Sequence, residues 1–416
     1  MNYCLGIDFG TSGARGIVID REQQIVATAD HIFDTQTENN LSFCWQQALY
    51  SLLEQVPLLI RKNLKAIAIN GTSSTVLLCD NKGSLIGQPL LYSNSQGKFL
   101  LNKVKEIAPA NHVVISATSS LVKLFWYQQQ PFFERAKYFL HQADWLSFLL
   151  HGKLGVSDYH NALKLGYDVE NLCYPDWLQK LSCSDLFPQV LAPGTVIKEV
   201  TKQISDRFSL KKNCLVCTGT TDSIAAFLAS GATKPGEAVT SLGSTMVLKL
   251  LSETKVENSQ YGIYSHRLGN LWLTGGASNT GGAVLKHFFS DRQLRDLSSQ
   301  INPNLTNNLE YYPLLQPGER FPINNPNLAP QLSPRPNNDL EFLHGLLSSM
   351  ARIEGLGYSK LQQLGANKLI RVYSAGGGAK NSVWQQIRHQ HLQVPVITAK
   401  NTEAAYGTAL LALQAI

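Results

Sequence analysis

The chain has 416 residues, of which 44% are hydrophobic and 16% charged, and this is the composition of a folded globular protein. A chain of this length exceeds one ordinary hydrophobic core, so we expect two domains or three. The 36 Lys and Arg residues against 30 Asp and Glu residues leave a formal net charge of +6 without any basic run. This distribution argues against nucleic acid and membrane surfaces as partners.

The cysteines and the apolar segments bear on the compartment of the protein. Seven cysteines, an odd number, favour a reducing environment over a disulfide scaffold. Cys214 and Cys217 have the CxxC spacing, but they fall in a predicted strand, where residues three apart point to opposite faces, and no second CxxC or CxxH accompanies them. With no basic-then-apolar leader before Tyr3 and no apolar stretch long enough to span a bilayer, we expect a soluble cytoplasmic protein.

The first half of the chain opens as an antiparallel meander and continues with mixed helices and strands. A turn rich in Gly, Ser and Thr joins the first two strands, and Gly152 suits the C-terminal cap of a helix. The pattern predicts, in chain order, strands over 3–8, 15–20 and 24–29, a helix over 43–59, a strand over 64–70, a hairpin that turns at 81–83, and helices over 126–130 and 133–150.

A repeat marks the second half. The strand, small-residue turn and strand over 237–250 echo the opening hairpin, so we expect two similar domains, residues 1–225 and 226–416. Strands mixed with helices make each an α/β domain with a mixed sheet flanked by helices, and the last helix is free to pack back on the first domain. The other predicted elements are a strand over 213–219, a helix over 223–232, a long loop over 302–338, a strand over 369–374, and helices over 382–392 and 402–414.

The opening turn offers a binding site for phosphate. Glycines let the backbone N–H groups of residues 10–13 approach an anion, and Thr11 and Ser12 add hydroxyls. Asp8, just before the turn, is placed to hold Mg²⁺ directly or through water, and Arg15 could meet a phosphate or substrate oxygen. An ordinary hairpin remains the alternative interpretation.

The letters Asp-Phe-Gly at residues 8–10 also mark the magnesium-binding aspartate of protein kinases. In those enzymes the motif comes late, after a glycine-rich loop, a strand lysine and a catalytic loop. None of these precedes residue 8, so the protein-kinase interpretation fails.

Three further stretches complete the candidate site. Gly243, Ser244 and Thr245 form a matching tip in the second half, and the triple glycine at 376–378 follows a strand and opens a helix, where its backbone could lie against a base or ribose. The triple glycine lacks the Gly-Lys-Ser ending of a Walker phosphate-binding loop and the glycine spacing of a dinucleotide-binding fingerprint. Asp222 stands where a strand hands over to a helix and suits a general base, although residues 220–222 also read as an ordinary N-terminal cap.

In this order the motifs resemble the FGGY carbohydrate kinases, relatives of actin, hexokinases and the heat-shock chaperone ATPases. The resemblance runs from Gly6 to Leu413. The stretches that carry it are GIDFGTSGAR at 6–15, LFWY at 124–127, DWL at 144–146, HG at 151–152, SDYHNA at 157–162, GTTDS at 219–223, SLGST at 241–245, PGERFP at 317–322, GGGAKN at 376–381 and EAAYG at 403–407.

The resemblance implies two actin-like (ribonuclease H-like) ATPase domains with a cleft between them, and phosphoryl transfer from Mg²⁺-ATP to a sugar or polyol hydroxyl. It implies Asp222 as the catalytic base, with Asp8 and Thr11 as further catalytic residues and Asp8 as the metal ligand. The residues implied to bind ATP are Thr11, Gly243, Ser244, Thr245, Gly376, Gly377, Gly378 and Asn381. The residues implied to bind the sugar are Asp8, Ser12, Gly13, Arg15, Ser73, Asp222 and Ser223.

Two departures bear on the substrate. Residues 70–74 read Asn-Gly-Thr-Ser-Ser where the usual xylulose kinases carry Met-His-Gly, and residues 91–95 lack the Trp, Asp and Arg that those enzymes and glycerol kinases carry. The resemblance is to the short cyanobacterial and plant pentulose kinases, which favours D-ribulose, with xylulose or another ketose or polyol as the alternative. An actin-like or chaperone-like ATPase and a non-catalytic sugar sensor are the other classes considered. We expect a monomer or homodimer.

Overall fold

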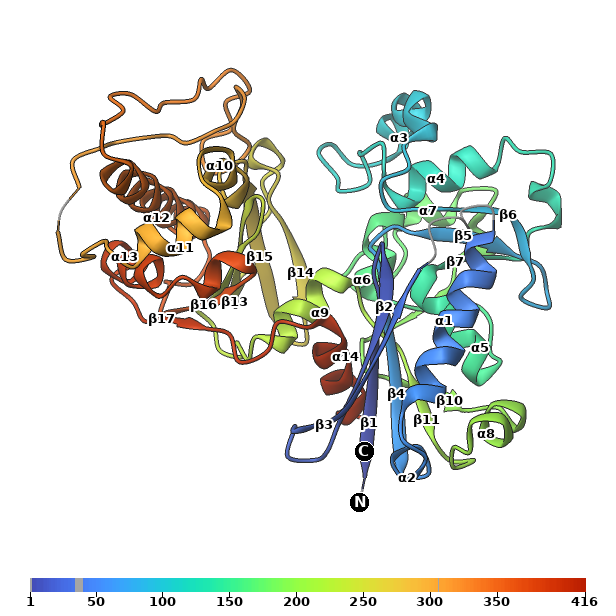
Figure 1. Cartoon of the computed structure of the whole chain (residues 1–416). Helices are drawn as coiled ribbons and strands as arrows, with labels where there is room; N and C mark the ends of the chain where they lie inside the picture. Colours follow the sequence, from blue (N-terminus) through green and yellow to red (C-terminus); the bar gives the residue numbers. More distant parts are fainter. Residues whose placement is uncertain (1, 34–39, 306) are drawn as a thin grey trace. The chain divides into compact units, whose positions relative to one another are not determined.

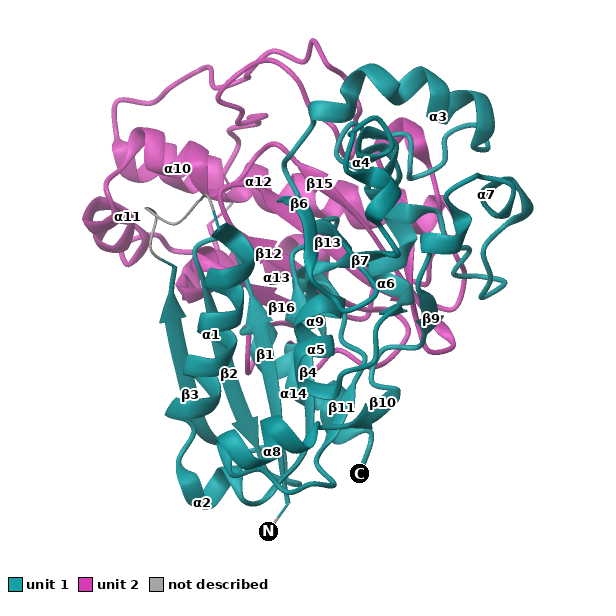
Figure 2. Cartoon of the chain, turned by 90° about the vertical axis from the view of Figure 1, so that its right-hand side faces the viewer, with its two compact units in different colours: residues 1–229, 403–416 teal, residues 230–402 magenta. Residues whose placement is uncertain are grey.

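The computed structural model describes residues 2–33, 40–305 and 307–416. The chain divides into two compact units, one made of residues 1–229 and 403–416 and the other of residues 230–402 (Figure 2). The chain therefore leaves unit 1 after Ala229 and returns to it at Glu403.

Unit 1 contains the opening meander and most of the predicted elements of the first half (Figure 1). Its elements are β1 (Tyr3–Phe9), β2 (Gly13–Ile19), β3 (Ile25–Ile32), α1 (Leu41–Gln55), α2 (Leu58–Arg61), β4 (Leu64–Gly71), β5 (Val76–Cys79), β6 (Leu85–Leu90), α3 (Leu101–Ile107), α4 (Ser120–Tyr127), β7 (Tyr138–His141), α5 (Gln142–His151), β8 (Val156–Asp158), α6 (Tyr159–Ala162), α7 (Asp176–Gln179), β9 (Gln189–Leu191), β10 (Val196–Glu199), α8 (Lys202–Phe208), β11 (Leu215–Cys217), α9 (Asp222–Ala229) and α14 (Ala404–Leu413).

The main sheet of unit 1 has the strand order β10-β11-β4-β1-β2-β3 and is mixed, since β4 runs parallel to β1 and β11 while β2 runs antiparallel to β1. Side chains alternate between its two faces. Leu5 and Ile7 join the core on the side of α1 and α5, whereas Cys4 joins the core on the side of α14 (Figure 1). A Cβ on Gly6 would lie 2.1 Å from the carbonyl oxygen of Ala405, so α14 packs directly on the strand backbone.

Unit 2 repeats this plan. Its elements are β12 (Glu237–Leu242), β13 (Met246–Ser252), β14 (Tyr264–Leu268), β15 (Leu271–Ser278), α10 (Gly282–Phe288), α11 (Asp291–Ser298), α12 (Asp339–Gln363), β16 (Arg371–Ala375), α13 (Ser382–Leu392) and β17 (Val396–Thr398). The sheet order is β14-β15-β13-β12-β16-β17, and β12 pairs antiparallel with β13 and parallel with β16, as β1 does with β2 and β4. The expectation of two α/β domains built on one plan is confirmed.

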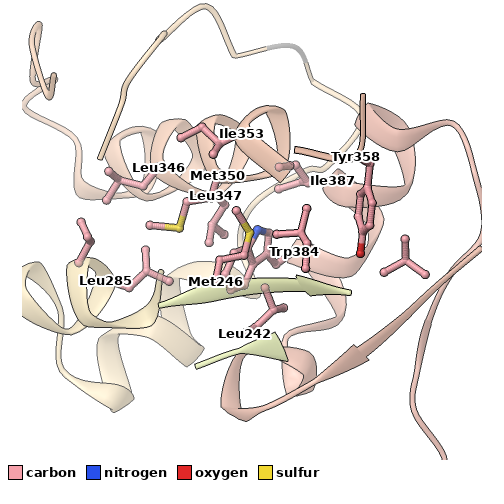
Figure 3. Packing of buried hydrophobic residues seen from close by; sticks show 14 of the residues in the cluster. Leu242, Met246, Leu285, Leu346, Leu347, Met350, Ile353, Tyr358, Trp384 and Ile387 are labelled. Carbon is pink, nitrogen blue, oxygen red and sulfur yellow. The ribbon is translucent and has the colours of Figure 1, made fainter. Parts of the chain in front are cut away.

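The core of unit 2 lies between its sheet and the two helices α12 and α13. Figure 3 shows Trp384 of α13 among Leu242 and Met246 of the sheet and Leu347 and Met350 of α12. All of these side chains are buried, and this packing holds the ends of the central strands in place.

Three sequence expectations are corrected. The helix expected over 133–150 is a strand, β7, followed by α5, because residues 138–141 pair with β5 and this tertiary pairing overrides helical periodicity. The helix expected over 126–130 is α4, which begins earlier because the Ser119 side chain accepts a hydrogen bond from the Val122 N–H. The helix expected over 43–59 ends at Gln55, before Pro57.

Two other expectations are confirmed, the helix cap at Gly152 and the long loop over 302–338. Gly152 ends α5 in a left-handed conformation with φ of 71°. The described residues of the 302–338 segment form a long loop without a helix or strand. Among the residues that the structure describes, no helix has the length and apolar character needed to cross a membrane.

Candidate active site

The candidate site in unit 1 begins where β1 ends. Asp8 is paired with Arg15 on β2 and with Asn70 on β4. Paired residues on neighbouring strands share a face, and by alternation this is the face of Gly6, against which α14 packs. Three polar side chains therefore lie side by side at one edge of the sheet.

The carboxylate of Asp8 is in an unfavourable position for a lone negative charge. Its Oδ1 is buried and has no hydrogen-bond partner among the described residues. Burial, followed by the charges of Asp222 and Glu403, raises the pKa of Asp8 to about 7, against the opposing effects of Asn70 and Arg15. The site thus calls for a proton or a cation at this oxygen.

The donors at this position fit Mg²⁺. In the part of the chain that is described, no group of three or more His, Cys, Asp or Glu side chains could enclose a metal ion. Mg²⁺ is commonly held by one or two carboxylates while water and phosphate oxygens fill its other positions. One unpaired carboxylate oxygen, Asp8 Oδ1, with a second carboxylate nearby meets that requirement.

Arg15 lies beside Asp8 but is engaged by protein carboxylates. Its Nε donates to Asp30 Oδ1 at 2.6 Å, and its other branch bonds to Glu403. Glu403 directly precedes α14, so this arginine joins β2 and β3 to the start of that helix. In the sequence, Glu403 belongs to the EAAYG stretch at 403–407, and no role was predicted for it. The signal that could have indicated a role is its position as a charged residue at the start of a predicted helix.

Asp222 is brought to the same edge by the chain that follows β11. Gly71 at the end of β4 forms a bridge with Thr221, and a Cβ on Gly219 would lie only 1.6 Å from the Ile69 carbonyl oxygen. Asp222 is the first residue of α9, and its Oδ1 accepts a hydrogen bond from the Ser223 N–H at 2.7 Å. The structure therefore brings Asp8 and Asp222 together, as their electrostatic coupling also indicates.

A buried polar network supports the residues before Asp222. His160 Nδ1 lies 2.7 Å from Thr220 Oγ1, and Asn161 Nδ2 donates to the Thr220 carbonyl oxygen at 3.3 Å. Asn161 also donates to Asp158 Oδ2 at 2.6 Å. All four side chains are buried. Sequence reasoning singled out residues 157–162 as a motif but missed this supporting contact, because it joins segments far apart in the chain.

The remaining unit 1 candidates lie on loops and helix ends nearby. The first tip is closed by a hydrogen bond from the Gly10 N–H to the Gly13 carbonyl oxygen at 3.0 Å, and it leaves Thr11 and Ser12 exposed. A Cβ on Gly13 would lie 2.6 Å from the His31 carbonyl oxygen, so the tip needs glycine there. Ser73 is half-buried in the loop after β4, and Ser223 is exposed on α9.

The second tip, in unit 2, is held from behind by a segment that sequence reasoning missed. The N–H groups of Gly282 and Ala283 donate to the carbonyl oxygens of Gly243 and Ser244 at 2.8 and 3.0 Å. The Gly243 N–H in turn donates to the Thr245 carbonyl oxygen at 3.2 Å. The close packing of two glycine-bearing turns fixes the backbone of this tip.

The triple glycine leaves the sheet beside that tip, since Ser241 of β12 is paired with Ala375 of β16. Gly376 has φ of 79° and packs on Leu242, whereas a Cβ on Gly377 would meet no atom within 4 Å. Asn381 caps α13 by accepting from the Trp384 N–H at 3.0 Å and donates to Ser298 Oγ at 2.9 Å. Unit 2 thus gathers its candidate nucleotide-binding residues at one edge of its sheet.

Comparisons with known proteins match both halves of the chain to one family. Residues 3–229 match the model of the N-terminal domain of the FGGY family of carbohydrate kinases, and residues 238–416 match the model of its C-terminal domain. A xylulose kinase of Staphylococcus xylosus is 23% identical and covers 99% of this chain and 90% of its own length.

Solved structures show the same fold. Ligand-bound xylulose kinase from Lactobacillus acidophilus is similar with a TM-score of 0.82 at 18% identity, covering 100% of this chain and 89% of that chain. Plasmodium falciparum glycerol kinase with ADP is similar with a TM-score of 0.84 at 17% identity, covering 99% of this chain and 89% of that chain.

The two-unit, actin-like α/β fold and the family matches define an ATP-dependent carbohydrate kinase. More particularly, the chain belongs to the FGGY family of carbohydrate kinases. This membership sets aside the chaperone-like and actin-like alternatives.

Proposed function

We propose that the protein phosphorylates the primary hydroxyl of D-ribulose with ATP, giving D-ribulose 5-phosphate and ADP. The observation that carries the proposal is the placement of Asp8 and Asp222, two carboxylates from different elements, at one edge of the unit 1 sheet. One suits a cation and the other suits a proton, as transfer from a metal-bound nucleotide to a hydroxyl requires.

In the proposed reaction Asp222 accepts the proton of the attacking hydroxyl as its oxygen bonds to the γ-phosphorus. The bond from that phosphorus to the bridging oxygen breaks, and ADP leaves with the electron pair. Asp8 holds Mg²⁺ directly or through water, and the ion, when bound, neutralises phosphate charge. Thr11, exposed on the first tip, binds phosphate oxygens through its hydroxyl and the backbone of the tip.

The nucleotide is assigned to unit 2. The second tip, Gly243 to Thr245, binds phosphate, and the triple glycine at 376–378 with Asn381 binds the nucleoside. The open space beside Gly377 and the fixed position of Asn381 support this assignment.

The sugar is assigned to hydroxyl and amide groups around Asp8. Ser12, Gly13, Ser73 and Ser223 supply short polar contacts, and Arg15 contributes while it is held by Asp30 and Glu403. The preference for D-ribulose rests on the resemblance to short pentulose kinases. Xylulose is the second candidate, because the relative from Staphylococcus xylosus, which matches nearly the whole chain, is a xylulose kinase.

A substrate panel tests the proposal. The purified protein is incubated with ATP, Mg²⁺ and each of D-ribulose, D-xylulose, hexuloses, pentitols, gluconate and glycerol, and ADP release is followed by a coupled assay. We expect the highest kcat/KM with D-ribulose. A clear preference for xylulose or glycerol would contradict the assignment of D-ribulose as the substrate. Absence of sugar-dependent turnover with every compound would contradict the proposed kinase function itself.

A further inference from the structure

A buried lysine ties together two loops at the candidate sugar site. Lys123 lies on α4 with only 1% of its surface exposed. Its Nζ donates to the carbonyl oxygens of Ser74 and Leu91, both at 2.7 Å, and of Tyr92 at 3.2 Å. Three carbonyls match the three N–H donors of an ammonium group. They favour the charged amine against burial, which, with a smaller contribution from Lys164, lowers the pKa of Lys123 to about 7.

The first of these loops, residues 72–75, continues β4 beyond the sheet edge at which the segments of Asp8 and Asp222 lie. Asn70 is paired with Asp8, and Gly71 forms a bridge with Thr221. The loop therefore begins directly after the two β4 residues that contact the segments of Asp8 and Asp222, and Ser73 is its second residue.

The conformation of this loop depends on contacts from outside it. Ser74 has φ of 64°, a left-handed conformation that is uncommon for a residue with a side chain, and its hydroxyl is buried without a partner among the described residues. Strain of this kind persists where surrounding contacts fix the backbone. The bond from Lys123 to the Ser74 carbonyl oxygen is such a contact, and Gln142 supplies another by accepting from the Thr72 N–H at 3.2 Å.

The second loop leaves β6 at Leu91 and Tyr92. It is joined to the first directly, because the Tyr92 N–H donates to Thr75 Oγ1 at 3.0 Å. Lys123 thus holds both loops from the helix side with one ammonium group.

We propose that Lys123 is a positioning residue for the sugar, which fixes the 72–75 loop so that Ser73 presents its hydroxyl to a neutral ketose beside Asp8 and Asp222. This inference rests on the proposed function. An apolar side chain would fill the same space in α4, but it could not fix the Ser74 carbonyl. Loss of the ammonium group therefore weakens sugar binding while the nucleotide residues of unit 2 stay unchanged.

Two substitutions of Lys123, with one control substitution on the same helix, separate positioning of the loop from packing of α4. Lys123→Met removes all three hydrogen bonds. Lys123→Gln, with a side chain one atom shorter and two N–H donors in place of three, cannot keep all of them and should raise the sugar KM by a smaller factor than Lys123→Met. Tyr127→Phe is the matched control. The Tyr127 hydroxyl donates to the carbonyl oxygens of Gln88 on β6 and Val76 on β5 at 2.7 and 3.3 Å, so it joins α4 to these strands and not to a carbonyl of the 72–75 loop.

With D-ribulose and with D-xylulose as probes, we expect Lys123→Met to raise the sugar KM about tenfold or more, which corresponds to about 1.4 kcal/mol. The KM of Lys123→Met for ATP should stay within about twofold of the wild-type value. For Tyr127→Phe, the KM values for the sugar and for ATP should both stay within that range. We also expect Ser73→Ala to raise the sugar KM in the wild-type background but to add little to Lys123→Gln, because both act through one loop.

Equal sugar KM values for Lys123→Gln, Tyr127→Phe and wild type would overturn the inference, as would full additivity with Ser73→Ala. If Lys123→Met does not fold, Lys123→Gln decides alone. Absence of sugar turnover in the wild-type protein would instead contradict the proposed function, so the two failures are distinguishable.

Discussion

Asp8, near the end of β1, and Asp222, at the start of α9, lie at the same edge of the unit 1 sheet, and after burial the charge of Asp222 is the next contribution that raises the pKa of Asp8 to about 7. Two carboxylates held close together disfavour their own ionisation. This arrangement is unfavourable for the empty protein and favourable once a cation arrives. We therefore expect the ionised carboxylate of Asp8 to lower the free energy of unfolding of the metal-free protein, although the same carboxylate is needed for activity.

Asp8→Asn should therefore stabilise the protein while removing Mg²⁺-dependent turnover. The pKa of Asp8 is higher in the folded protein than its ordinary value of 3.8, so the folded state binds the proton more tightly. The contribution of Asp8 to stability then falls as pH rises from about 4 to about 7 and stays low above that range.

Denaturant unfolding of the variant without nucleotide or metal checks this prediction. The stability gained by Asp8→Asn should grow across that pH window to roughly 1–3 kcal/mol and level off above it. Asp206→Asn, at an exposed position on α8, is the control and should show no such trend. An Asp8→Asn protein that is less stable than wild type at pH 8 would show that the carboxylate is not electrostatically strained.

The triple glycine offers a test of the nucleotide assignment by two neighbouring substitutions. Gly377→Ala adds a methyl group to open space, so it should leave the melting temperature unchanged and raise the KM for ATP severalfold. Gly376→Ala should lower the melting temperature as well, because that residue has a positive φ and an added Cβ would lie only 2.8 Å from the Leu242 carbonyl oxygen. Unchanged ATP kinetics in Gly377→Ala would place the nucleoside elsewhere.

A buried ion pair in unit 2 predicts a large loss of stability. Arg388 Nε donates to Glu354 Oε2 at 2.6 Å, its second branch donates to Glu354 Oε1 at 2.7 Å, and both side chains are almost completely buried. Arg388→Met leaves the Glu354 charge buried without its cation, which should cost about 3–5 kcal/mol of unfolding free energy.

A double variant, Arg388→Met with Glu354→Leu, should recover part of that loss, because it removes the uncompensated charge as well. Chemical denaturation of the single and double variants measures both effects. A single variant within about 1 kcal/mol of wild type would mean that water or another group compensates Glu354.

The sequence was sufficient for the parts of the fold that local patterns encode. The meander over residues 3–29 and the hairpin over 237–250 were predicted because alternating apolar strands and glycine turns are short-range signals. The strand β7 was missed because only its pairing with β5 distinguishes it from the start of α5. The long helix α12 was not predicted, although it forms much of the unit 2 core.

The candidate site shows the same division. Asp8, Thr11 and Asp222 stand out in sequence because each adjoins a turn or a strand end. Glu403 and Lys123 did not, since their significance comes from contacts with residues far away along the chain. Pairing of this kind is a property of the fold and leaves no local pattern in the residues themselves.

The central claim is that Asp222 accepts the proton of the sugar hydroxyl, and one measurement tests it most directly. Sugar-dependent ADP release is followed for Asp222→Ala beside wild type and the exposed control Asp206→Ala, with the best sugar of the panel and with folding checked by circular dichroism. The account predicts a loss in kcat of at least about 10²-fold for Asp222→Ala in a folded protein, and no change for the control. Wild-type turnover in the folded Asp222→Ala protein would contradict it.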